Sequence, residues 1–195
     1  MAGYPPISLL LRTPMPGIDP NRPFVPVQIA ILTVSDTRTA TDDRSGDTLA
    51  QRASEAGHVV VARRIVSDDQ AAIVAALRQW TDDEAIDVVL STGGTGVTGR
   101  DVTPEAFHTV YDKEIPGFGE LFRQISFTKI GTSTIQSRAT GGVTNGTYLF
   151  ALPGSTGACK DAWDGILANQ LDYRYRPCNF VEIMPRLREH LVPRK

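Results

Sequence analysis

The chain has 195 residues, of which 41% are apolar and 22% are charged, a composition typical of one compact domain of about 100–200 residues. This composition excludes a fibre, a coiled coil and a disordered chain. The 20 Lys and Arg residues against 22 Asp and Glu residues give a formal net charge of −2, so the chain lacks the positive field that gathers phosphate backbones, which argues against nucleic acid as a partner.

The cysteines and apolar runs predict the compartment. Cys159 and Cys178 are too few for a disulfide framework. The apolar run at residues 7–11 is too short for the core of an export signal and is followed by Arg12. No apolar run approaches the ~20 residues that span a bilayer. We therefore expect a cytoplasmic protein with reduced thiols and no membrane partner.

The first 26 residues hold seven of the 13 prolines. Because proline lacks a backbone N–H, we expect neither a helix nor a paired strand in residues 1–26. This N-terminal arm is either an extended leader or a segment that packs on a neighbouring subunit. We expect a single domain over residues 27–186 and a solvated C-terminal tail over residues 187–195.

From residue 27 onward, strand patterns and helix patterns alternate. The β-branched run 27–34 is typical of a strand buried on both faces of a parallel sheet. The capping box Ser67 to Gln70 predicts a helix from Asp68, and Thr103 is expected to cap a helix whose first residue is Pro104. Further strands are predicted at 59–66, 88–91 and 148–152, and further helices at 45–56, 116–131 and after 157. This alternation predicts an α/β fold, a three-layer α/β/α sandwich with a mostly parallel sheet.

The strongest local signal is the glycine-rich loop after the strand 88–91. It contains Gly93, Gly94, Thr95 and Gly96. Glycines let successive backbone N–H groups converge on an anion such as phosphate. The stretch also fits the dinucleotide-binding pattern G-x-G-x-x-G, but that pattern opens a helix directly, whereas residues 100–101 intervene here. A phosphate cradle is our first interpretation, with a dinucleotide loop and a simple tight turn as alternatives.

Two other predicted strands also end in small polar loops. Pro153, Gly154 and Ser155 follow one of them, and Ser35 and Asp36 follow another. Ser155 is either a helix cap or part of an anion site, and Ser35 and Asp36 are also ordinary turn residues. Because the carboxyl ends of parallel strands meet at one edge of a sheet, the three loops predict one shared crevice for a phosphorylated ligand.

Two carboxylates are placed to serve phosphoryl chemistry. Asp101 follows the glycine-rich loop, and Asp68 follows the strand 59–66. Mg²⁺ is usually held by one or two carboxylates together with phosphate oxygens of the substrate. Each Asp also suits a position near a helix start for the helix dipole alone, so both interpretations stay open. The histidines and cysteines lack the spacing of a zinc site.

Five motifs resemble, in order and spacing, the MogA/MoaB family of molybdenum-cofactor biosynthesis proteins. They are TGGTG at 92–96, RDVTPEA at 100–106, PGFGE at 116–120, Ser137-Arg138 and LPGS at 152–155. The resemblance covers about residues 26–186. The stretches 130–138 and 176–180 are similar to the MoaB branch rather than the MogA branch. Two positions depart from the family pattern, Ser67 where proline is frequent and Thr156 where the MogA branch has proline.

This resemblance implies a subunit that assembles as a trimer, or as a hexamer of two trimers, and binds molybdopterin. Active members of the family adenylylate molybdopterin with MgATP and release pyrophosphate. The family's two functionally important aspartates correspond to Asp68 and Asp101, which are also our candidate Mg²⁺ ligands. The residues expected to line the crevice for ATP and molybdopterin are Ser35, Asp36, Gly93, Gly94, Thr95, Gly96, Glu120, Ser137, Arg138, Pro153, Gly154 and Ser155.

Three functions remain to be separated. The first is the adenylyltransferase, which the two retained carboxylates favour. The second is a non-catalytic protein that holds molybdopterin or its precursor among other proteins of the same pathway. The third is NAD-dependent redox chemistry, which the spacing between the glycine-rich loop and the next helix disfavours. The sequence does not separate a trimer from a hexamer.

Overall fold

A six-stranded sheet forms the centre of the molecule in the computed structural model, which describes residues 16–189. The strand order is β3-β2-β4-β7-β6-β5. The strands are β2 (Gln28–Val34), β3 (Val59–Val66), β4 (Val88–Thr92), β5 (Lys113–Glu114), β6 (Thr140–Thr144) and β7 (Thr147–Leu152). Strands β3, β2, β4 and β7 run parallel, β6 is antiparallel to β7, and β5 is antiparallel to β6. The predicted mostly parallel sheet is confirmed.

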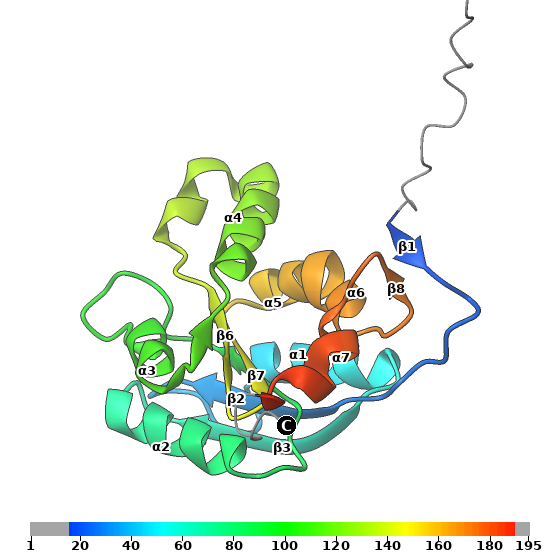
Figure 1. Cartoon of the computed structure of the whole chain (residues 1–195). Helices are drawn as coiled ribbons and strands as arrows, with labels where there is room; N and C mark the ends of the chain where they lie inside the picture. The colour runs from blue at the N-terminus through cyan, green and yellow to red at the C-terminus, as the bar shows by residue number, and fades with distance from the viewer. Residues whose placement is uncertain (1–15, 190–195) are drawn as a thin grey trace, which may run out of the picture.

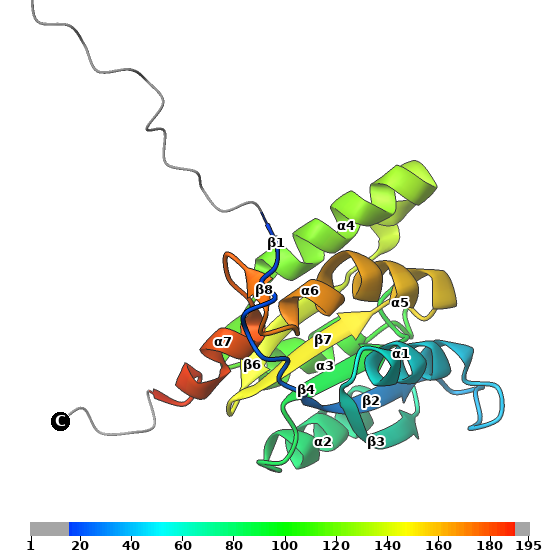
Figure 2. The same cartoon turned by 90° about the vertical axis from the view of Figure 1, so that its right-hand side faces the viewer.

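Helices cover both faces of this sheet (Figure 2). One face carries α1 (Arg44–Glu55), α4 (Pro116–Ile130) and the helical run of α5 (Thr156–Ala162), η3 (Trp163–Leu167) and α6 (Ala168–Gln170). The other face carries α2 (Gln70–Thr81) and α3 (Thr103–Val110). Along β2, Ile31 packs with the first layer and Leu32 with the second, because successive strand side chains point to opposite faces. The predicted three-layer α/β/α sandwich is confirmed.

The start of the described chain packs against its own subunit. Strand β1 (Gly17–Ile18) pairs antiparallel with β8 (Tyr175–Arg176), near the upper right of Figure 1. The prediction that residues 1–26 contain no paired strand is therefore wrong, since two residues between prolines suffice for a short ladder. Arg22 also pairs with Glu182 at 2.9 Å. The expectations of a leader or an inter-subunit arm for residues 1–15 lie outside the described residues.

The start of α2 differs from the prediction. The helix begins at Gln70 rather than at Asp68, and its cap is Asp69, whose carboxylate accepts a hydrogen bond of 2.8 Å from the N–H of Ala72. Ser67 does not cap it. The backbone N–H of Asp68 instead donates to the carboxylate of Asp36 at 3.1 Å. The loop after β2 therefore holds this residue outside the helix.

The start of α3 differs in a similar way. Thr103 is the first residue of the helix, and Val102 occupies the cap position without a side-chain hydrogen bond. The prediction that Thr103 caps the helix is wrong, because its hydroxyl donates to the carbonyl oxygen of Gly93 at 2.9 Å. In both helices, a loop at the carboxyl edge of the sheet takes up a group that local sequence rules assign to the helix end.

The chain closes with α7 (Phe180–Ile183) and η4 (Met184–Arg186), and the predicted C-terminal tail is described up to Glu189. Within it, Arg188 donates to the carbonyl oxygen of Asn145 at 2.9 Å and pairs with Glu84 at 2.7 Å. A fully solvated tail is therefore wrong for Arg188, because the turn between β6 and β7 binds its side chain. Residues 190–195 lie outside the described residues. Between residues 16 and 189, the helices are too short or too polar to span a membrane.

Candidate functional site

The loops after β4 and β7 lie in contact at the carboxyl edge of the sheet. We call residues 93–96 the glycine loop and residues 153–155 the β7 turn. The N–H of Gly93 donates to the carbonyl oxygen of Leu152 at 3.0 Å, and the hydroxyl of Thr92 donates to that of Pro153 at 3.1 Å. A Cβ atom on Gly154 would lie 3.2 Å from the Cα of Gly93. The structure thus brings these two predicted loops together.

The backbone of the glycine loop requires glycine at two positions. Gly93 has a φ of +107° and Gly94 a φ of +62°, values that L side chains rarely adopt. A Cβ atom on Gly93 would lie 2.2 Å from the carbonyl oxygen of Val34, the last residue of β2. The loop therefore passes directly over the end of β2, which brings it next to the polar residues that follow that strand.

Asp68 lies beside the glycine loop. A Cβ atom on Gly94 would lie 3.3 Å from Asp68 Oδ1, while Asp68 Oδ2 accepts a hydrogen bond of 2.9 Å from the N–H of Asp36. Together with the bond from the Asp68 N–H, this reciprocal pair joins the loops after β2 and β3. Burial raises the pKa of Asp68, and the negative charge of Asp101 raises it further. The charge of Asp101 therefore reaches Asp68 across the loop.

Asp101 closes the other end of the glycine loop. Its Oδ2 accepts hydrogen bonds from the N–H of Thr98 at 2.8 Å and from the Thr98 hydroxyl at 2.7 Å. Burial alone would raise the pKa of Asp101, but the bonds from Thr98, the N–H of Gly96 and the charge of Arg138 outweigh it and lower the pKa. Asp101 is therefore a fixed negative charge at neutral pH, next to the less readily ionised Asp68.

Ser35 and Asp36 shape the loop after β2. Ser35 Oγ accepts hydrogen bonds of 3.2 Å from the N–H groups of Thr37 and Arg38, which makes a tight turn. Asp36 pairs with Arg100 in addition to its bonds with Asp68. The structure places both predicted residues at the carboxyl edge, where they hold neighbouring loops together.

The other three predicted residues lie around a groove beside the glycine loop. This groove has a volume of about 490 Å³ between α3, α4 and residues 135–140, and its lining includes Glu120, Ser137 and Arg138. The Oγ atom of Ser137 is buried and has no hydrogen-bond partner among residues 16–189. The sequence predicted one shared crevice, whereas the lining of this groove does not include the glycine loop, the β7 turn or residues 35–36, so the predicted residues fall on two adjoining surfaces.

Arg138 joins these two surfaces. Its Nε donates to the carbonyl oxygen of Gly96 at 2.7 Å, and its Nη2 donates to that of Asp101 at 2.6 Å. Its Nη1 pairs with Glu105 of α3. The guanidinium therefore holds the last residue of the glycine loop and, beyond it, the backbone of Asp101. Arg138 also contributes positive charge to the groove.

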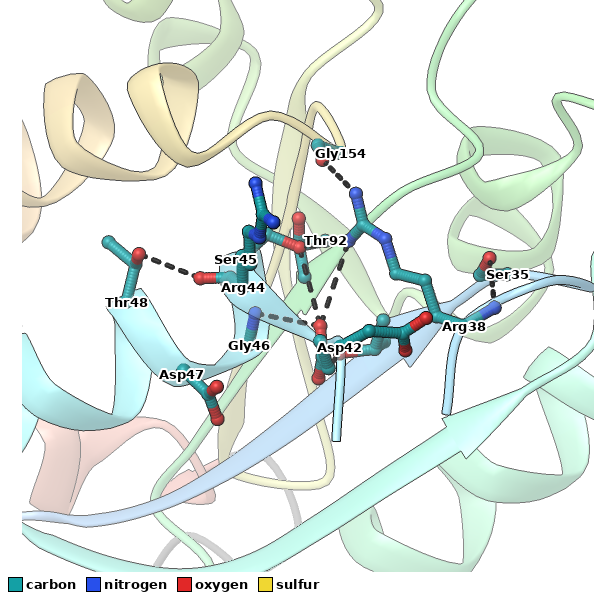
Figure 3. Close-up of polar contacts among 12 residues, drawn as sticks. Ser35, Arg38, Asp42, Arg44, Ser45, Gly46, Asp47, Thr48, Thr92 and Gly154 are labelled. Carbon is teal, nitrogen blue, oxygen red and sulfur yellow. Dashed lines mark hydrogen bonds and ion pairs between the residues drawn. The ribbon is translucent and has the colours of Figure 1, made fainter. Parts of the chain in front are cut away.

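Two charged residues of the site escaped the sequence interpretation, and Figure 3 shows the first of them, Arg38, directed toward Gly154. Arg38 Nη2 donates to the carbonyl oxygen of Gly154 at 2.6 Å, and its guanidinium lies 3.6 Å from the carboxylate of Asp43. Asp43 caps α1 by accepting a 3.0 Å hydrogen bond from the N–H of Gly46. An acidic residue just before a predicted helix was a signal for the cap. No local pattern indicated that Arg38 reaches the β7 turn.

The carboxylates fit a magnesium ion better than a transition metal. In the part of the chain that the structure describes, no group of three or more His, Cys, Asp or Glu side chains could hold a metal ion. Two carboxylates, Asp68 and Asp101, flank the glycine loop. Mg²⁺ prefers oxygen ligands and keeps waters and substrate phosphates as further ligands, so two carboxylates suffice.

The dinucleotide alternative lacks its structural context. Residues 97–102 separate the glycine loop from the first residue of α3. The pyrophosphate of a dinucleotide binds where a helix begins directly at the glycines. Here the helix end is displaced, and Thr103 is bonded to Gly93 instead. The loop geometry therefore favours a phosphate cradle that is completed by the neighbouring loops.

Comparisons with known proteins agree with this architecture. Residues 30–173 match the family described as a probable molybdopterin binding domain. Molybdenum cofactor biosynthesis protein B of Escherichia coli K12 is 54% identical over 157 residues, which are 80% of this chain and 92% of that protein. A crystal structure of a molybdenum cofactor biosynthesis protein B has a TM-score of 0.77 at 42% identity, covering 85% of this chain and 98% of that one. A MogA structure has a TM-score of 0.68 at 31% identity, covering 74% and 94%.

Proposed function

This chain belongs to the molybdopterin-binding family of molybdenum-cofactor biosynthesis proteins, in its MoaB branch, and on that premise we propose that it adenylylates molybdopterin with MgATP. The family and branch inferred from the sequence motifs are thus confirmed. The observation that carries the proposal is the pair of carboxylates, Asp68 and Asp101, that flank the glycine loop, where the charge of Asp101 raises the pKa of Asp68. A protein that only holds a pterin has no use for two carboxylates beside a phosphate cradle.

In the proposed reaction, an oxygen of the terminal phosphate of molybdopterin attacks the α-phosphorus of ATP. The bond between that phosphorus and the bridging oxygen breaks, and pyrophosphate leaves. Little covalent chemistry falls to the protein, so its residues position the two phosphates and neutralise charge. Asp101 and Asp68 would hold Mg²⁺ or its waters, and bound Mg²⁺ supplies charge neutralisation. The N–H groups of the glycine loop would bind phosphate oxygens.

We propose that the groove beside the glycine loop binds one of the two ring systems of the substrates, either the pterin of molybdopterin or the adenine of ATP. Its volume of about 490 Å³ lies in the usual range of small-molecule pockets. The buried hydroxyl of Ser137 offers a hydrogen bond that no described residue satisfies, and Glu120 adds an acceptor at the groove wall. Both the pterin and the adenine ring carry N–H donors that such groups bind. The groove adjoins the loop through Arg138, so the phosphates of a bound ligand would reach the glycine loop.

The test is mass-spectrometric detection of adenylylated molybdopterin after incubation of the purified chain with molybdopterin, ATP and Mg²⁺. We expect product from the wild type and at least about 100-fold less from Asp101→Asn, because a charge at the reacting phosphates is lost. Asp69→Asn is the matched control. Asp69 directly follows Asp68 in the sequence and caps α2, where Asn serves equally well.

A wild-type chain that binds molybdopterin but forms no product would overturn the proposed reaction. The non-catalytic binding protein would then be the better description. Binding is measured separately, by the change in pterin fluorescence on titration with the protein, so that loss of chemistry and loss of binding are distinguished. Nicotinamide cofactor binding in the same assay would favour the redox alternative.

We also propose that the subunit assembles into a trimer or a hexamer, together with other proteins of the pathway as partners. Four large apolar side chains are exposed on α4 and η2 (Gly131–Gln136), namely Leu121, Phe127, Ile130 and Ile135. Such clustered exposed side chains favour a protein contact surface. The proposed compartment is the cytoplasm, which agrees with the free thiols of Cys159 and Cys178.

A further inference from the structure

Arg38 crosses the end of the sheet from one loop to another. It follows β2, whereas Gly154, whose carbonyl oxygen accepts the 2.6 Å bond from Arg38 Nη2, follows β7. Strand β4 lies between β2 and β7 in the sheet. Arg38 Nη1 also donates to the hydroxyl of Ser45 in the first turn of α1. One guanidinium therefore ties α1 to the β7 turn across an intervening strand (Figure 3).

Asp43 holds this guanidinium in place. Its side chain is only 3% exposed and lies 3.6 Å from Arg38. Its two oxygens also accept hydrogen bonds from the hydroxyl of Thr33 at 2.6 Å and from the N–H of Gly46 at 3.0 Å. A Cβ atom on Gly46 would lie 2.0 Å from Asp43 Oδ2, so α1 packs tightly on the carboxylate. A buried carboxylate fixed in this way needs a cation beside it, and Arg38 is one.

The bond from Arg38 sets the orientation of one peptide group in the β7 turn. In a trans peptide, the carbonyl and the following N–H point in opposite directions. The only cis bond among residues 16–189 precedes Pro177, so the peptide after Gly154 is trans. With the Gly154 carbonyl directed at Arg38, the N–H of Ser155 points away from it. The same glycine packs against Gly93, so the orientation is fixed relative to the glycine loop.

From this geometry we infer that Arg38, held by Asp43, is a positioning residue that sets the β7 turn against the glycine loop, so that both present N–H donors to the phosphates of one ligand. The identity of that ligand rests on the proposed function. The role requires the forked guanidinium. A lysine at position 38 keeps the charge but loses the two separate nitrogens from which the guanidinium bonds Ser45 and Gly154.

The experiment compares Arg38→Lys with Arg63→Lys in the full chain. Arg63 is the matched control, because it lies 3.5 Å from the same Asp43 carboxylate but pairs with Asp47 and does not contact the β7 turn. The first measurement is amide hydrogen exchange without ligand in peptides that cover residues 153–158. We expect about tenfold faster exchange in Arg38→Lys and no change in Arg63→Lys, since only the first variant loses a charged hydrogen bond to the turn. Peptides from α2 report any global loss of stability.

The second measurement is the kinetics of adenylyl transfer. In Arg38→Lys, we expect the KM for ATP to rise about tenfold with a smaller change in kcat, because misplaced donors weaken binding in the ground state and the transition state alike. Arg63→Lys is expected to keep both constants within about twofold. A fall in kcat alone would contradict a positioning role.

The two measurements separate this inference from the proposed function. Unchanged exchange at residues 153–158 in Arg38→Lys would overturn the inference, whether or not the chain forms product. Equal acceleration in Arg63→Lys would also overturn it, because the effect would then come from losing a guanidinium contact with Asp43 and not from losing the bond to the β7 turn. Faster exchange in Arg38→Lys alone, from a chain whose wild type forms no product, supports the positioning role and rejects the adenylyltransferase.

Discussion

The carboxyl edge of the sheet and the projection formed by α4 and η2 are built in opposite ways. At the edge, side chains bind backbone groups of other loops, as Arg138 binds the carbonyl of Gly96 and Arg38 that of Gly154. In the projection, Phe127 is 56% exposed and Ile135 81% exposed. Figures 1 and 2 show α4 extending beyond the body of the molecule. We propose that the edge binds a small anionic ligand, whereas the projection presents its exposed apolar side chains to another protein.

Within α4, the face toward the sheet is buried and the opposite face is exposed. Phe118 and Phe122 are 3% and 1% exposed and pack in the core with α5 and the sheet. Phe127, on the opposite face, is not part of this core. The inner face therefore anchors the helix, whereas the exposed side chains of the outer face contribute little to the packing of the subunit. Substitutions should consequently affect subunit stability strongly at the edge and weakly on the projection.

The largest effect is expected for Gly93→Ala in the glycine loop. The new Cβ atom would meet the carbonyl oxygen of Val34 at 2.2 Å in a backbone conformation that alanine rarely adopts. We expect a loss of about 3 kcal/mol in the free energy of unfolding. Urea denaturation measures it. The control is Gly99→Ala, since Gly99 has no other atoms within 4 Å of its Cβ position. Equal urea midpoints for Gly93→Ala and Gly99→Ala would show that the glycine loop relaxes away from β2.

The next effect distinguishes the two aspartates at the edge. Asp101→Asn is expected to cost about 1–2 kcal/mol, because the carboxylate accepts two hydrogen bonds from Thr98. Asp68→Asn is expected to stabilise the fold by up to about 1 kcal/mol, because it removes a half-buried charge close to another of the same sign. Under the proposed function, both variants are expected to lose adenylyl transfer. Thermal unfolding at pH 7 measures whether each variant raises or lowers the melting temperature. A change in the same direction for both variants would contradict this division of roles.

The dependence of fold stability on pH is expected to differ between Asp101 and Asp68, because their pKa values are shifted in opposite directions. Because the pKa of Asp101 is lowered from 3.8, its ionised form stabilises the fold above that value, and this contribution is lost as the pH falls through the lowered pKa. Because the pKa of Asp68 is raised from 3.8, its ionisation costs stability as the pH rises through the raised pKa. We expect the gain of Asp68→Asn over wild type to grow from about pH 4 upward. A gain that is constant from pH 3 to 7 would contradict the raised pKa of Asp68.

The smallest effect on the subunit is expected on the projection. The double variant Phe127→Gln, Ile135→Gln should change subunit stability by no more than about 0.5 kcal/mol, since both side chains are exposed. Light scattering should nevertheless show a monomer, because the apolar contact surface is lost. Val61→Thr is the control, as Val61 is 44% exposed on β3, away from α4. A double variant that keeps the wild-type mass would place the contact surface elsewhere.

Much of the fold could be predicted because its signals are local. The β-branched residues of β2 follow one another directly, and the glycines after β4 fall within residues 93–96, so periodicity predicts the strand and turn chemistry predicts the loop. Strand β6 escaped prediction because its sequence TGGVT lacks a strand pattern. A Cβ atom on Gly142 would lie 2.4 Å from the ring of Tyr111, so the aromatic ring fills the space that a strand side chain normally occupies. The reason for this strand is a tertiary neighbour.

The candidate site also contains features that the sequence predicted and features that only the tertiary structure decided. Sequence spacing alone placed Asp68 and Asp101 at the carboxyl edge, because each follows a strand or its loop directly. Which side chains meet there was decided only by the tertiary structure. Arg38 and Gly154 are 116 positions apart, and Arg138 and Gly96 are 42 apart. A local pattern carries no information about such pairs, because the sheet order that brings them together is set by the packing of the whole core.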